Sequence, residues 1–235
     1  EGTLGVNVFY TQMDYDRCEL PLTIASGASK RVLLPVRPQA RQDMYAFELV
    51  RDGAIVAEKR VTPARLASPD TLTVGLLSDN ARALGHFAQR ANGADTLRGE
   101  TWTTIPLTPD TFPDTDDLMR AFTMLVVDGI DLRTLSQAQQ EAMTAWLLSG
   151  GIVVLSGGAK AATGWPFFEQ WTNLSAGALA EHADITPALL RYTGINGSAV
   201  GEPIWLSAMP ADGALVQSDG QGLFRLDKAG EGLIY

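Results

Sequence analysis

The chain has 235 residues, of which 46% are hydrophobic and 19% charged. This composition excludes a disordered or collagen-like chain, and the length fits one large domain or two small ones. Lys and Arg number 18 against 27 Asp and Glu, so we expect no nucleic-acid partner, because phosphate binding needs clustered positive charge. No apolar run is long enough for a membrane-spanning helix, and the one cysteine, Cys18, excludes an internal disulfide.

Residues 1–66 carry apolar side chains at every second position, a period that indicates antiparallel strands with one buried face. Asp52-Gly53 separates the last two runs and predicts a tight hairpin turn. The pattern predicts a small immunoglobulin-like β-sandwich, and because five strands are few for a closed sandwich we expect another strand before Glu1. The five runs span residues 6–10, 20–24, 32–36, 45–49 and 55–61.

Residues 62–69 contain two prolines and no alternation, which predicts a linker. Beyond it, apolar runs alternate with helical signals. The clearest helix begins with a capping box at Ser136 and Gln139 and ends at Gly150-Gly151, between two apolar runs. Because such a strand–helix–strand unit requires a right-handed crossover between parallel strands, residues 70–235 are predicted to form an open, mostly parallel α/β sheet of flavodoxin-like or amidotransferase-like type.

The predicted elements of this second domain are short. The end of the chain contains four apolar runs, and because a domain rarely ends within a strand we expect further chain after Tyr235. The predicted strands span residues 72–77, 102–107, 124–127, 152–155, 204–206, 215–217, 223–226 and 233–235, and the predicted helices span residues 81–90, 116–122, 136–148 and 185–192.

Residues 126–132 (VVDGIDL), 135–148 and 150–158 (GGIVVLSGG) follow one another as strand and loop, helix, and two glycines with a strand and a Gly-rich turn. This order resembles the class I glutamine amidotransferase-like superfamily, over residues 70–165 and extending toward 235. The similarity is closest to membrane-anchored bacterial surface members, in which a β-sandwich precedes the α/β domain. The resemblance implies an extracytoplasmic location, with the membrane reached only through segments outside residues 1–235; the alternative is a cytoplasmic protein.

Catalytic members of the superfamily carry a nucleophilic cysteine in a Gly-x-Cys-x-Gly turn. At the matching positions this sequence has Ser156 for the cysteine and Val154 for the first glycine, and Cys18 lies in the other domain. These departures argue against glutamine hydrolysis. The sequence therefore favours a non-catalytic binding or scaffolding module.

One alternative is a serine-dependent hydrolase with Ser156 as nucleophile. A serine needs a base within hydrogen-bond reach, and His182 is the candidate, oriented by Asp184 or Glu181. The family's own His-x-Glu pair lies much further along the chain than His182, which follows Ser156 by 26 positions.

Three carboxylates, those of Asp79, Asp128 and Asp131, follow the C-terminal ends of predicted strands, the edge at which open α/β sheets bind ligands. Two interpretations are open. Either Asp79 caps a helix and the other two bind loop amides, or the three serve metal or phosphate chemistry as in receiver domains. The second needs a lysine after the last strand, where none stands because Lys228 precedes that strand.

Two further motifs concern ligands. Residues 157–160 (GGAK) lack the spacing of a phosphate-binding loop. The aromatic residues Trp165, Phe167, Phe168 and Trp171 form either a lid packed on the sheet edge or a platform that binds a sugar or peptide. The expected partner is thus a small molecule, a glycan or a protein, with no cofactor; two histidines and one cysteine disfavour a metal site.

Overall fold

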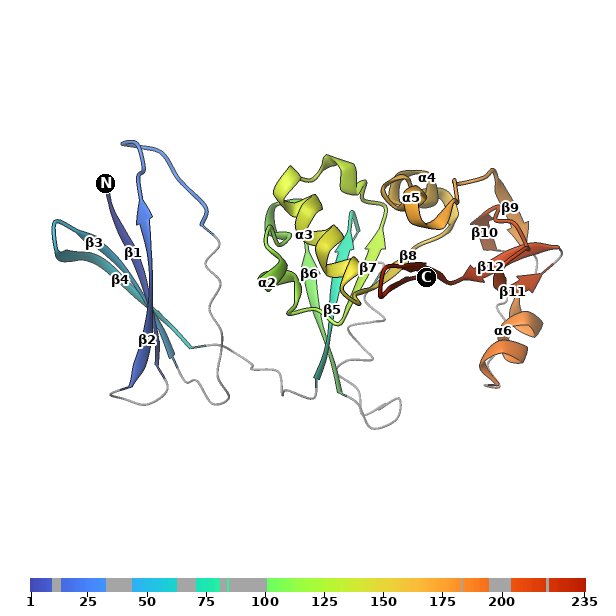
Figure 1. Ribbon diagram of the computed structural model, residues 1–235, viewed down its shortest axis with the longest axis horizontal. Coiled ribbons are helices and arrows are strands. Elements are labelled where there is room, and N and C mark those ends of the chain that lie inside the picture. The colour runs from blue at the N-terminus through green and yellow to red at the C-terminus, as the bar shows by residue number, and fades with distance from the viewer. Residues whose placement is uncertain are drawn as a thin grey trace. The chain divides into compact units, whose positions relative to one another are not determined.

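A computed structural model describes residues 1–9, 14–32, 44–62, 71–80, 84, 101–182, 184–194, 204–218 and 220–235. The chain divides into two compact units, Glu1–Asp70 and Thr71–Tyr235, and each is described by itself. The first contains an antiparallel sheet, and the second contains helices and a mostly parallel sheet (Figure 1). The predicted combination of a β domain with an α/β domain is confirmed at this level.

The first unit contains a four-stranded antiparallel sheet in the order β2-β1-β3-β4. β2 starts earlier than the predicted run at residues 20–24, because it pairs with β1 along its whole length, from Gly2 opposite Leu22 to Phe9 opposite Tyr15. The predicted strand at 32–36 falls almost entirely outside the described residues. The strands are β1 (Gly2–Phe9), β2 (Tyr15–Leu22), β3 (Met44–Arg51) and β4 (Ala54–Val61).

The two faces of this sheet differ in chemistry. Val6 is fully buried on one face. On the other, Arg17 Nη1 donates to Glu48 Oε2 at 2.6 Å, and Asn7 Nδ2 donates to Glu48 Oε1 at 2.8 Å. The predicted hairpin turn is confirmed, since residues 52 and 53 both have positive φ, 50° and 78°.

The second unit is built on a six-stranded sheet in the order β6-β5-β7-β8-β14-β13. All neighbouring strands are parallel except β13 and β14, which are antiparallel. The strands are β5 (Thr71–Ser78), β6 (Thr101–Leu107), β7 (Met124–Asp128), β8 (Ile152–Leu155), β13 (Asp227–Ala229) and β14 (Gly232–Ile234).

Helix α3 (Gln137–Leu148) supplies one side of the main core. Its capping box is present, with Ser136 N donating to Gln139 Oε1 at 3.0 Å and Gln139 N donating to Ser136 Oγ at 3.3 Å. Trp146 is buried in this core, and its Nε1 donates to the carbonyl oxygen of Phe122 at 3.1 Å. The helical face therefore packs as its apolar spacing predicts.

Shorter elements surround the sheet. The predicted helix at 81–90 lies outside the described residues apart from Leu84. The sequence does not predict β9, because its residues 179–182 show no apolar run and are held by pairing with β10. The remaining elements are η2 (Pro109–Thr111), α2 (Asp116–Met119), η3 (Leu132–Thr134), η4 (Gly158–Lys160), α4 (Ala161–Gly164), η5 (Pro166–Phe168), α5 (Glu169–Thr172), β9 (Leu179–His182), α6 (Thr186–Thr193), β10 (Ile204–Ser207), β11 (Ala214–Ser218) and β12 (Gln221–Arg225).

The turn between α3 and β8 provides a test of the core packing. A Cβ on Gly151 would lie 2.6 Å from Cε2 of the buried Trp146 ring. We expect Gly151→Ala to destabilise the second unit by about 2 kcal/mol through overpacking, as measured by urea unfolding followed by tryptophan fluorescence. All five tryptophans lie in this unit.

The matched control is the neighbouring Gly150→Ala. Gly150 has φ +116°, and a Cβ there would meet nothing within 4 Å, so the cost of this substitution comes from the backbone alone. In a Trp146→Leu background the Gly151→Ala penalty should shrink while the Gly150→Ala penalty stays. Equal behaviour of the two glycines in both backgrounds would contradict the packing explanation.

Candidate functional site

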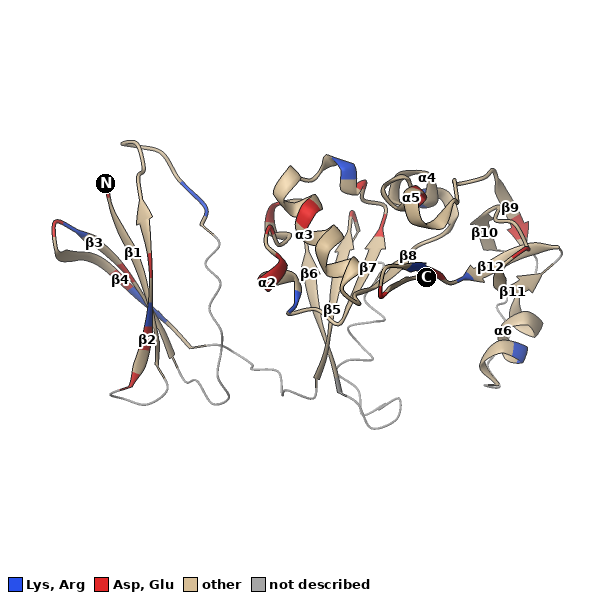
Figure 2. Ribbon diagram, in the orientation of Figure 1, with Lys and Arg blue, Asp and Glu red and all other residues tan. Residues whose placement is uncertain are grey.

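The strand order changes direction between β5 and β7, since β6 follows β5 in the chain but pairs on its other side. Ligands of open α/β sheets bind at the carboxyl ends of the strands at such a point. The parallel strands carry no charge along their length, and Asp128 ends β7 (Figure 2). Ser78 ends β5 and Asp79 follows it, and Ser156 follows β8.

Lys160 joins these strand ends. Its Nζ donates to Asp79 Oδ1 at 2.6 Å and to Asp128 Oδ2 at 2.8 Å. Ser78 Oγ donates to the same Asp128 oxygen at 2.7 Å, and the hydroxyl of Ser156 lies near enough to this carboxylate to help lower its pKa. We call these five residues, Ser78, Asp79, Asp128, Ser156 and Lys160, the Lys160 cluster.

Two glycine-containing turns create the cluster. The turn after β8 passes through Gly158, with φ +73°, into η4 and so brings Lys160 back toward β5 and β7. The turn after β7 passes through Gly129, with φ +72°. A Cβ at Gly129 would lie 2.8 Å from Lys160 Cδ and 2.9 Å from Asp79 Oδ2, so only glycine fits both the backbone and the space.

Asp128 and Lys160 hold each other in their charged forms. Burial acts to raise the pKa of Asp128, but the hydrogen bonds from Lys160, Ser78 and Ser156 outweigh it, so the pKa lies below its usual value of 3.8. The hydrogen bonds to Asp128 and Asp79 raise the pKa of Lys160 above 10.5. Near neutral pH the two carboxylates and one ammonium therefore carry a net charge of −1.

The sequence alone does not indicate that Lys160 belongs to this site. The receiver-type interpretation needs a lysine after the last strand, whereas the structure supplies one from the turn after β8. The available signal is the GGAK motif at residues 157–160, whose lysine follows a strand end by a few positions. The motif of a phosphate-binding loop is defined by the spacing of its glycines, so a search for that motif does not find a lysine that pairs with carboxylates at a strand end.

Asp131 lies apart from these contacts. Its Oδ1 accepts from the backbone N of Arg133 at 2.9 Å, and its Oδ2 forms an ion pair with the Arg133 guanidinium at 2.8 Å. Asp131 thus binds a loop amide at the start of η3. In the part of the chain that the structure describes, no group of three or more His, Cys, Asp or Glu side chains is placed to hold a metal ion.

The residues of the serine-hydrolase alternative have other partners. The Ser156 hydroxyl lies near the Asp128 carboxylate, whose pKa it helps to lower. His182 is buried on β9, and its Nδ1 has no hydrogen-bond partner among the described residues. Asp184 accepts from the backbone N of Thr186 at 2.8 Å, and its hydrogen bonds with Thr186 lower its pKa. The described hydrogen bonds therefore do not link the three into a triad; Glu181 lies on β9 beside His182.

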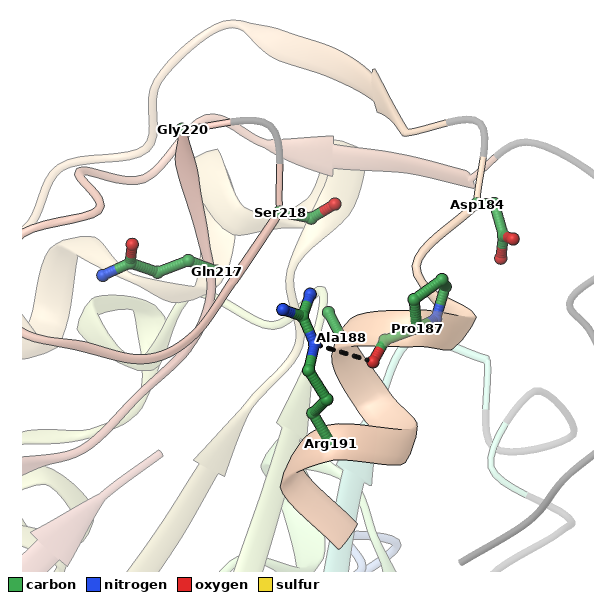
Figure 3. A pocket seen from close by; sticks show the side chains of 7 residues that line it. All are labelled: Asp184, Pro187, Ala188, Arg191, Gln217, Ser218 and Gly220. Atoms are coloured by element: carbon green, nitrogen blue, oxygen red, sulfur yellow. Dashed lines mark hydrogen bonds between the residues drawn. The ribbon is translucent and has the colours of Figure 1, made fainter. Parts of the chain in front are cut away.

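Asp184 instead lines an open, polar cavity of about 370 Å³ (Figure 3). Arg191 projects into it from α6, and its Nε donates to the carbonyl oxygen of Pro187 at 3.1 Å. Gln217, Ser218 and Gly220 close the other side of the cavity.

The aromatic segment has two environments. Trp165 is 9% exposed, and its Nε1 donates to the carbonyl oxygen of Ser156 at 3.0 Å. Trp171 packs against Phe167 and Phe168, with ring centroids 5.9 and 6.2 Å apart. Trp171 packs against the main core, whereas Trp165 forms part of the wall of a second cavity.

That second cavity, which we call the Trp165 cavity, has a volume of about 230 Å³. It lies at the carboxyl ends of β8 and β14, next to the two-stranded sheets β9-β10 and β11-β12 of the same unit. Its lining is mostly apolar, and the charged pair Arg225 and Asp227 meets it at one side. Apolar lining residues include Leu155, Trp165, Ile204, Leu206 and Leu223.

No protein-family model and no curated protein matches the sequence. Among solved structures, a cytoplasmic protein from Salmonella typhimurium is similar with a TM-score of 0.42 and 12% sequence identity, over 69% of this chain and 85% of that chain. A similarity at that level supports no inference about fold or function. Within the described residues, no helix combines the length and apolar character needed to cross a membrane.

The Lys160 cluster predicts a pH-dependent contribution to stability. Lys160→Met keeps the aliphatic stem and removes the charge. We expect a loss of about 1–2 kcal/mol at pH 7, because hydrogen bonds to charged groups are strong but Lys160 is 35% exposed. As the folded pKa of Asp128 is lowered, its stabilisation is present above pH 3.8 and is lost as the pH falls further.

The difference in the free energy of unfolding between wild type and Lys160→Met, measured by urea unfolding from pH 3 to 7, should therefore become smaller as the pH falls below 3.8. Arg133→Met is the matched control, since the Arg133 side chain is 57% exposed in its pair with Asp131 and its loss should cost less stability than Lys160→Met. A Lys160→Met loss that equals the control, or that does not change with pH, would disprove the assignment.

Proposed function

We propose that the chain is a non-catalytic ligand-binding module with an amidotransferase-like α/β domain. The observation that carries this proposal concerns the surroundings of Ser156, the residue at the position of the family's nucleophile: the carboxylate near its hydroxyl, that of Asp128, is ion-paired with Lys160 at 2.8 Å. A serine nucleophile needs a base whose pKa lies near the working pH. A carboxylate whose pKa is lowered by Lys160 is a poor base.

The proposal includes the finer fold assignments. Taken in chain order, strands β5, β6, β7, β8 and β14 occupy the positions 2-1-3-4-5, which is the order of flavodoxin-like sheets. This order supports a flavodoxin-like or amidotransferase-like arrangement for residues 70–235. For residues 1–66 we propose an immunoglobulin-like sandwich, of which the antiparallel sheet β2-β1-β3-β4 would be one layer.

We further propose that the module is the extracytoplasmic part of a bacterial membrane-anchored protein, as the resemblance to surface members of the superfamily implies. In intact source cells, external protease should then remove the epitope of an antibody raised against residues 1–235. Protection until the cells are lysed would instead support the cytoplasmic alternative.

Covalent labelling tests the absence of catalysis. A fluorophosphonate probe should give no adduct at Ser156 in the folded protein, and Ser156→Ala should leave any background labelling unchanged, because the carboxylate near the hydroxyl is ion-paired with Lys160 and is a weak base. Mass spectrometry of the labelled peptide provides the measurement. An active serine hydrolase serves as positive control for the probe, and Ser149→Ala is the control variant at a helix end away from the cluster. An adduct at Ser156 that disappears in Ser156→Ala would show that the serine-hydrolase alternative is correct.

A further inference from the structure

We infer that the Trp165 cavity binds an uncharged, planar aromatic ligand of about nine non-hydrogen atoms. The inference rests on the proposed binding role and assigns it a site and a ligand class. It follows from three properties of the cavity, namely its lining, its size and the fixed position of one wall.

The lining disfavours a charged ligand. Its charged members already satisfy one another, since Arg225 Nε donates to Asp227 Oδ2 at 2.9 Å and Arg225 Nη2 donates to Asp227 Oδ1 at 3.0 Å. The side chains of this pair are 23% and 17% exposed. A charged ligand would lose its hydration against apolar walls and would have to compete with this ion pair for a partner, which is costly. An uncharged ligand avoids this cost.

The volume sets the size of the ligand. Apolar cavities of about 150 Å³ remain dry and accept benzene, which has six non-hydrogen atoms. In proportion, the 230 Å³ of the Trp165 cavity accommodates about nine. Indole has this size and is a suitable probe.

The Trp165 wall is held in place, which favours a flat ligand. The hydrogen bond from Trp165 Nε1 to the Ser156 carbonyl oxygen fixes the orientation of the indole ring. Ser156 belongs to the Lys160 cluster, so this hydrogen bond connects the cluster with the cavity wall. An aromatic side chain in a cavity wall favours offset-stacked or edge-to-face packing with a second ring. The cavity is thus prepared for an aromatic ligand before the ligand arrives.

Gly157 offers a way to fill the cavity without strain. It lines the cavity with φ −87° and ψ −160°, a conformation that any residue adopts. A Cβ there would meet only Leu206 Cδ2, at 3.7 Å, which is an ordinary contact distance. Side chains of increasing size at this position should therefore occupy ligand space and leave the backbone unchanged.

The experiment is calorimetric titration of the whole chain with indole and with two charged aromatic compounds of the same size, benzoate and benzamidinium. We expect saturable binding of indole with a Kd below about 1 mM, and at least about tenfold weaker binding of the two charged compounds. Equal or tighter binding of either charged compound would overturn the assignment to an uncharged ligand. Absence of saturable indole binding would overturn the site, whereas the labelling of Ser156 tests the non-catalytic role separately.

Variants then locate the ligand. Indole binding should weaken progressively from Gly157→Ala to Gly157→Val to Gly157→Leu, by at least about tenfold in the last. Leu206→Trp should abolish it, whereas Leu215→Trp should not, because Leu215 lies outside the cavity on β11 and is 45% exposed. Circular dichroism confirms that each variant is folded. Unchanged affinity in folded Gly157→Leu would show that indole binds elsewhere and would refute the proposal.

Discussion

The ammonium group of Lys160 lies between two carboxylates at the point where the order of the parallel strands reverses. Parallel strands place their carboxyl ends together, so Asp79 and Asp128 become neighbours whatever their separation in sequence. Two carboxylates that lie this close to one ammonium group would repel each other if the ammonium group were absent. Lys160 supplies that cation from within the chain, and its position requires the turns after β7 and β8 to pass through glycine.

The turn after β8 has a second consequence. Ser156 connects the charged Lys160 cluster with the wall of the apolar Trp165 cavity, because its hydroxyl lies near the Asp128 carboxylate while its carbonyl oxygen accepts a hydrogen bond from Trp165 Nε1. One short segment therefore determines both the electrostatics at the sheet edge and the shape of the adjacent cavity.

The local features of the fold could be predicted because their causes are local. The capping box at Ser136 and Gln139, the Asp52-Gly53 turn and the fully apolar runs of β7 and β8 each express a short-range rule of backbone hydrogen bonding or side-chain burial. β9 escaped prediction because it depends on pairing with β10, more than twenty residues later in the chain.

The candidate site shows the same division. The sequence by itself determined that Asp79, Asp128 and Ser156 follow the ends of apolar strands, because this depends only on residue identity and local period. Only the tertiary structure decided that Lys160 pairs with Asp79 and Asp128, across 81 and 32 positions of sequence, and that Trp165 and Arg225 border one cavity. These contacts arise from the strand order and from turn geometry at glycines, and neither leaves a periodic trace in the sequence.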